Sequence, residues 1–103
     1  MGNVADFRRL NPREFSGNED LLESEQWITD VENLLEVANV PATDYVKVVR
    51  VQLTDVARTW WLAEVAKTQA PHTWKQFSDG FFKRFFPESA QKDLEERFIA
   101  LKQ

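Results

Sequence analysis

Aromatic and basic side chains are concentrated in one stretch of the sequence, residues 74–87, which reads WKQFSDGFFKRFFP. Six of its fourteen residues are Trp or Phe, and three are Lys or Arg. Aromatic rings interleaved with cations can stack on bases while neutralising phosphates, which is the chemistry of single-stranded nucleic-acid binding. The same rings could instead belong to a membrane segment or a hydrophobic core, and the rest of the sequence has to distinguish these possibilities.

The charge balance of the whole chain argues against a surface built to hold phosphates. The 103 residues carry 13 Lys and Arg against 17 Asp and Glu, which gives a formal net charge of −4. The basic residues of the stretch lie off the helical stripe of its main aromatic residues, so a solvated face is expected for Lys75, Lys83 and Arg84. No direct, specific nucleic-acid binding is therefore expected of this chain.

Residues suited to catalysis or metal binding are scarce. The sequence has no Cys and a single His, His72, and it contains no Gly-rich phosphate loop, HExxH or GxSxG motif. Carboxylates that are adjacent in sequence, such as Glu95 and Glu96, point apart on a helix and do not form a catalytic pair. We therefore expect no enzymatic activity, no cofactor and no metal site.

Glu64 is the carboxylate with the most unusual setting, because it falls between Trp60 and Trp61 on a helical wheel. It is expected either to extend toward solvent or to pair with a basic residue of the N-terminal segment, of which the candidates are Arg8, Arg9 and Arg13.

Neither membrane insertion nor secretion is indicated. No apolar run approaches the roughly 20 residues that a membrane span requires, and the N-terminus lacks the apolar region of a signal peptide. A soluble, cytoplasmic protein without a membrane partner is expected.

Five helices are predicted to follow an extended N-terminal arm of residues 1–23. The first begins with Ser24 as its N-cap, and its apolar residues recur at intervals of three and four until Pro41 stops it. Thr73 and Gln76 form a capping box that opens the helix of the aromatic stretch. The other helices are expected over residues 43–53, 54–67 and, with Ser89 as N-cap, 89–103. The helical part, residues 24–103, forms a single domain.

The helical faces predict which residues form the core. The residues expected to be mostly buried are Trp27, Val31, Leu35, Leu53, Ala57, Trp60, Trp74, Phe77, Phe81 and Phe98. Gly80 inside a helix indicates that another element approaches closely there. A one-sided core does not need all the apolar residues, and the surplus consists of Trp61, Leu62, Phe82 and Phe86. Either the arm covers them, through Phe7 and Phe15, or they form a contact between subunits.

A resemblance is carried by the order and spacing of these residues: Phe15, Gly17, Trp27, Ile28, Glu32, Lys47, Val48, Leu53, Ala57, Trp60, Trp61, Thr73, Trp74, Phe77, Phe81, Phe85, Phe86, Pro87, Phe98, Leu101, Lys102 and Gln103. This pattern resembles the Gag domain of gypsy-type LTR retrotransposons and covers residues 15–103. The resemblance implies an all-α protein, a compact five-helix capsid-like bundle that is the N-terminal lobe of a capsid protein. Such lobes are not enzymes, and they self-associate into a shell that packages the RNA of the element.

The same resemblance implies a longer parent protein and an alternative function. In Gag polyproteins a second helical lobe and a zinc knuckle commonly follow, so we expect this chain to be a fragment that ends where the second lobe would begin. Domesticated Gag proteins such as Arc carry a matching lobe that binds short peptides in a groove. The partner is thus expected to be a second copy of the chain or a short peptide. The candidate interface residues are Phe15, Trp27, Trp60, Trp61, Leu62, Phe82 and Phe86.

Overall fold

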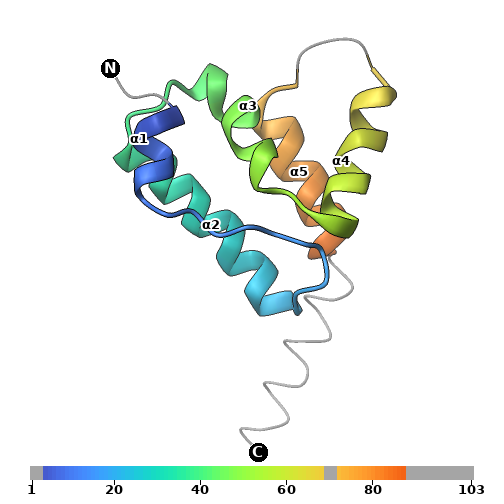
Figure 1. Cartoon of the computed structure of the whole chain (residues 1–103). Coiled ribbons are helices and arrows are strands. Elements are labelled where there is room, and N and C mark those ends of the chain that lie inside the picture. The colour runs from blue at the N-terminus through green and yellow to red at the C-terminus, as the bar shows by residue number, and fades with distance from the viewer. Residues whose placement is uncertain (1–3, 69–71, 88–103) are drawn as a thin grey trace, which may run out of the picture.

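Helices make up the regular structure of the protein in a computed structural model, which describes residues 4–68 and 72–87. Figure 1 shows helix α5 between α2 on one side and α4 on the other. The α-helices are α1 (Val4–Arg9), α2 (Leu21–Val37), α3 (Tyr45–Val49), α4 (Asp55–Ala66) and α5 (Trp74–Phe85), and the 3₁₀ turns are η1 (Ala42–Asp44) and η2 (Arg50–Gln52). The predicted all-α fold class is confirmed, although the helix predicted for residues 89–103, with Phe98, lies outside the described residues.

The start of α2 differs from the prediction. Asp20, not Ser24, is the N-cap, and its side chain accepts a hydrogen bond from the backbone N–H of Glu23 at 2.8 Å. Ser24 is buried inside the first turn, where its hydroxyl donates to the carbonyl of Asp20 at 2.9 Å. Asp and Ser are both good N-cap residues, so local sequence does not distinguish Asp20 from Ser24. In the fold, Ser24 is buried within the first turn of α2, and the helix therefore begins one turn earlier.

The N-terminal arm is also only partly extended. Residues 4–9 form α1, which inserts Phe7 into the core. Residues 11–19 have no helix, and we call them the strap, because they lead from the end of α1 across α2 to the far end of that helix, where α2 begins (Figure 1). The prediction of an arm extended throughout residues 1–23 was therefore wrong for its first part, since a single buried Phe suffices to hold a short helix against the bundle.

Backbone hydrogen bonds fix the strap at Phe15. Its N–H donates to the carbonyl of Gln52 at 2.9 Å, and its carbonyl accepts from the N–H of Thr54 at 2.9 Å, which forms an isolated parallel bridge with Leu53. One residue later, the carbonyl of Ser16 accepts from the N–H of Ala57 at 2.8 Å. The helix predicted over residues 43–53 is divided into η1, α3 and η2 in the structure. After η2, Leu53 is extended, and this conformation allows it to pair with the strap.

Gly17 allows the strap to lie close to α4. Its φ of +90° is a conformation that side-chain-bearing residues rarely adopt. A Cβ at this position would lie 2.9 Å from the backbone nitrogen of Ala57 and 3.0 Å from the ring of Phe85. Only glycine therefore fits this point of contact without a backbone shift.

Helices α4 and α5 agree well with the sequence prediction. The capping box at the start of α5 is confirmed, because Thr73 Oγ1 accepts from the N–H of Gln76 at 3.1 Å and Gln76 Oε1 accepts from the N–H of Thr73 at 2.9 Å. The close approach predicted at Gly80 is made by Trp60, whose Cζ2 atom lies 3.3 Å from where a Cβ would be. This contact joins α4 to α5.

Phe81 of α5 lies at the centre of the aromatic core. Its ring centroid is 4.9 Å from that of Phe15, 5.4 Å from that of Trp27 and 5.3 Å from that of Phe85. The predicted core residues that the structure buries are Trp27, Val31, Leu35, Leu53, Ala57, Phe77 and Phe81, whereas Trp60 and Trp74 are only partly buried. The aromatic stretch is thus a core-forming helix. No helix within residues 4–68 and 72–87 is long and apolar enough to cross a membrane.

Replacing Phe81 by Ala is expected to lower the free energy of unfolding by about 3–5 kcal/mol, because its removal leaves a cavity among four or more rings. Chemical denaturation of the purified chain measures this loss. Phe82→Ala is the matched control, since the neighbouring ring is only partly buried and its removal should cost less. Equal stabilities of the two variants would contradict the central position of Phe81.

Candidate interaction surface

The seven residues predicted for an interface lie in different environments. Phe15 and Trp27 belong to the core, where their rings stack at a centroid distance of 4.9 Å and an interplanar angle of 27°. The indole N–H of Trp27 donates to the carbonyl of Arg13 at 2.8 Å, so its polar atom is also satisfied within the fold. In this conformation neither ring presents its face to solvent.

The two adjacent tryptophans exchange the roles that the sequence predicted. Trp61, expected to be surplus, retains only 7 % of its exposure and contacts Phe77 and His72 at centroid distances of 5.0 and 4.9 Å. Trp60, expected in the core, is only partly buried against Phe77 and Phe85. Both rings therefore contact α5, Trp61 through Phe77 and Trp60 through Phe77 and Phe85.

Among the remaining candidates, only Leu62 is largely exposed. Phe86 is buried and Phe82 is partly buried, with their rings 6.4 Å apart in a T-shaped arrangement. Leu62 keeps 61 % of its side-chain surface open to solvent. It is therefore the sequence candidate that is available to a partner without any rearrangement.

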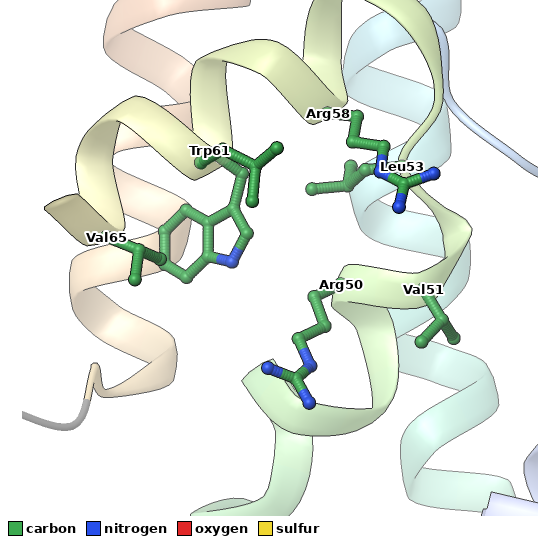
Figure 2. A pocket seen from close by; sticks show the side chains of 7 residues that line it. Arg50, Val51, Leu53, Arg58, Trp61 and Val65 are labelled. Carbon is green, nitrogen blue, oxygen red and sulfur yellow. The ribbon is translucent and has the colours of Figure 1, made fainter.

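Leu62 borders an open hollow of about 480 Å³ between α4 and η2. We call this site the α4 hollow; Figure 2 shows Arg58, Trp61 and Val65 along one face of α4 and Arg50 and Val51 on η2 across from them. The hollow is lined by Arg50, Val51, Leu53, Arg58, Trp61, Leu62 and Val65. Three of these apolar side chains, those of Val51, Leu62 and Val65, are exposed. The hollow is thus a surface of exposed aliphatic groups over a tryptophan floor.

Helical spacing explains the α4 side of the hollow. Arg58, Trp61, Leu62 and Val65 are separated by three, one and three residues, which places them along one face of the helix. This spacing is a sequence signal that could have identified Arg58 and Val65. Arg50 and Val51 come from η2, which lies across the hollow from α4 (Figure 2), so the spacing along α4 does not identify them.

The charged residues that line the α4 hollow are all basic. Arg50 and Arg58 both border it, and none of the seven lining residues is acidic. Within the described residues no ion pair involves either arginine. The site therefore combines exposed aliphatic surface with two cations that are not neutralised locally.

A second hollow, of about 270 Å³, lies where the strap crosses α2. Its lining residues are Asn11, Arg13, Trp27, Asp30, Val31, Asn33 and Leu34. Arg13 and Asp30 form a salt bridge of 2.9 Å across it. The candidate pairing of Arg13 with Glu64 is therefore not made, and Glu64 instead contacts Lys67 at 3.1 Å, one turn along α4. Charges at this second site are largely paired within the chain.

The carboxylate of Glu19 closes the strap onto itself. It accepts hydrogen bonds from the Ser16 hydroxyl at 2.6 Å and from the backbone N–H groups of Ser16 and Gly17 at 3.1 and 3.0 Å. Burial by itself raises the pKa of this carboxyl, but these hydrogen bonds to the charged form outweigh burial, so the pKa of Glu19 lies below its ordinary value of 4.5.

No cluster of three or more His, Asp or Glu side chains suited to a metal ion occurs within residues 4–68 and 72–87. His72, the one imidazole of the sequence, packs against the Trp61 ring. The features that stand out in the described residues are the helical bundle and its exposed apolar hollow, which are those of a small all-α domain with apolar surface left open.

Comparison with known families agrees with that class and specifies it. Residues 9–86 match the family described as the N-terminal capsid-like domain of the retrotransposon-derived protein PEG10. This match covers three quarters of the chain, from the end of α1 to the residue after α5, so the chain belongs to this family of Gag-derived capsid-like domains, which are structural and not catalytic. No curated protein and no solved structure matches the chain. The predicted resemblance to a Gag capsid domain is confirmed.

The lowered pKa of Glu19 predicts how folding depends on pH. Stability from its hydrogen bonds is fully present above pH 4.5 and is lost as the pH falls through the lower pKa of the folded state. Glu19→Gln should therefore unfold with a weaker dependence on acid than the parent chain, as followed by circular dichroism. Glu14→Gln, which changes an exposed strap carboxylate, is the control. Identical acid transitions for parent and Glu19→Gln would contradict this role.

Proposed function

We propose that this domain is the N-terminal lobe of a capsid and that it self-associates into a shell that packages RNA. The observation that carries the proposal is the α4 hollow, where Val51, Leu62 and Val65 stay exposed beside Trp61, although most aromatic rings of the described residues are buried. Exposed apolar patches of this kind are typical of protein interfaces. Family membership supplies the context in which that interface would work.

The contact between copies is weak by itself. The α4 hollow offers only a few aliphatic groups, which is little compared with the surface that a stable dimer buries. A shell does not need strong individual contacts, because many tethered copies convert weak contacts into stable assembly. The isolated domain is then mainly monomeric at micromolar concentration, and the assembled particle resides in the cytoplasm.

A second candidate function is the binding of short peptides, as in an Arc-like domesticated Gag protein. The observation that favours it is the second hollow, where Asn11 and Arg13 of the strap line an open site together with Trp27, Val31 and Leu34 of α2. Peptide binding there would change the environment of the Trp27 indole. A saturable shift of tryptophan fluorescence that does not depend on protein concentration would favour peptide binding over self-association.

Leu62→Asp is expected to reduce the yield of particles formed by the full-length Gag protein by more than about tenfold, because each of many repeated contacts would be weakened. The fold should be intact, since the side chain is exposed. Electron microscopy of purified particles is the measurement, and Leu10→Asp, a change at an exposed apolar residue away from α4, is the control. Normal particle yield with Leu62→Asp would refute an interface role for this residue.

Single-stranded RNA is expected to bind this domain only nonspecifically. The physical reason is the net charge of −4, with basic residues scattered among a larger number of acidic ones. Titration of fluorescently labelled RNA of several sequences at physiological salt measures the affinity. Submicromolar binding, or a clear preference for one sequence, would overturn the expectation.

A further inference from the structure

We propose that the α4 hollow of one copy receives the outer face of helix α2 of the next copy, so that the domains associate head to tail. This inference rests on the proposed self-association and goes beyond it by naming both surfaces. It is carried by the shape and charge of two faces of the same molecule.

The outer face of α2 is a continuous exposed stripe. At about 100° per residue, seven of its residues fall within roughly 120° of the helix circumference. They are Leu22, Glu25, Gln26, Thr29, Asn33, Glu36 and Val37, and all are exposed. Leu22 and Val37, at the two ends of the stripe, keep 60 % and 66 % of their surface open to solvent. The residues that α2 buries lie on the opposite side of the helix.

The charge of α2 is entirely acidic. The helix contains five Asp or Glu residues and no Lys or Arg. Two of these carboxylates are engaged within the fold, because Asp30 pairs with Arg13 and Glu32 accepts from the indole N–H of Trp74 at 3.0 Å. Glu25 and Glu36 lie on the outer stripe, roughly 16 Å apart along the helix, and no ion pair involves them within the described residues.

The α4 hollow is complementary to this stripe in both respects. It offers exposed aliphatic groups for Leu22 or Val37, and it offers Arg50 and Arg58 to the carboxylates of Glu25 and Glu36. Pairing the hollow with the hollow of another copy would instead bring like charges together, and pairing two α2 stripes would do the same. Charge therefore favours association between unlike surfaces.

The positions of the two surfaces allow one copy to use both at once. Helix α2 and helix α4 lie on opposite sides of α5 in Figure 1, and the α2 stripe is on the side of that helix turned away from the core. A contact between two different surfaces is heterologous, and its repetition generates a closed ring or an open array. Head-to-tail association through α2 and the α4 hollow would thus supply a repeating contact for a shell.

Two charge-reversal variants test the pairing. The hollow variant carries Arg50→Glu with Arg58→Glu, and the helix variant carries Glu25→Arg with Glu36→Arg. Sedimentation velocity is measured for each at up to about 1 mM, which matches the effective concentration of tethered domains. Each variant alone should self-associate more than about tenfold more weakly than the parent chain, because one of its two surfaces then repels the other. Lys75→Glu with Lys83→Glu, on exposed positions of α5, controls for net charge.

Mixing the two variants gives the decisive result. The intact hollow of the helix variant can take the intact α2 of the hollow variant, and the two reversed surfaces are also complementary. An equimolar mixture should therefore recover association between the two kinds of chain, although each is monomeric alone. Circular dichroism of both variants checks that they remain folded, which the exposure of all four positions predicts.

The outcomes separate this inference from the proposed function. If the parent chain associates and the helix variant associates equally well, or if the mixture stays monomeric, the pairing of α2 with the hollow is overturned while self-association stands. If the parent chain does not associate at any concentration or when tethered, both are overturned. If the hollow variant loses binding of labelled RNA but keeps the self-association of the parent chain, the arginines serve RNA and the inference is overturned.

Discussion

The backbone pairing of Phe15 with the turn between η2 and α4 is the interaction on which the rest of the domain depends. Two hydrogen bonds of 2.9 Å, to Gln52 and from Thr54, hold the strap while the Phe15 ring enters the aromatic core. The ring contacts Trp27 from α2 and Phe81 from α5, so one residue connects three parts of the chain that are distant in sequence. Without the strap, the Trp27 and Phe81 rings of these two helices would lose the Phe15 ring that covers them and would be more exposed to water.

This constraint explains both the excess of aromatic residues and where the exposed surface lies. The strap covers the side of the bundle that α2 and α5 form, because the Phe15 ring packs against Trp27 and Phe81 there. The same pairing holds Leu53 in an extended conformation between η2 and α4, and Leu53 lines the α4 hollow beside Leu62. Leu53 thus belongs both to the contact that fixes the strap and to the surface that we propose for self-association.

A good part of the fold could be predicted from the sequence because it depends on local rules. The capping box at Thr73, the stripe of Phe77 and Phe81 and the close approach at Gly80 all follow from spacing along one helix, and each is present in the structure. The candidate site was harder to predict. The sequence identified Leu62 as an apolar residue that the core does not need. It did not identify Arg50, because Arg50 lies in the short turn η2, and the position of such a turn beside α4 gives no periodic pattern in the sequence.

The sequence by itself determined an all-helical capsid-like domain of a Gag-derived family, since the helical periodicity and the order of aromatic residues are properties of the chain alone. Only the tertiary structure decided which rings are buried. Trp60 and Trp61 are about 100° apart on their helix, so only one of them could face fully inward, and the packing of α4 in the folded chain buries Trp61 more deeply. The tertiary structure also decided that Phe15 belongs to the core. The bridge that holds it joins two residues far apart in the sequence, and such a bridge leaves no periodic pattern in the sequence.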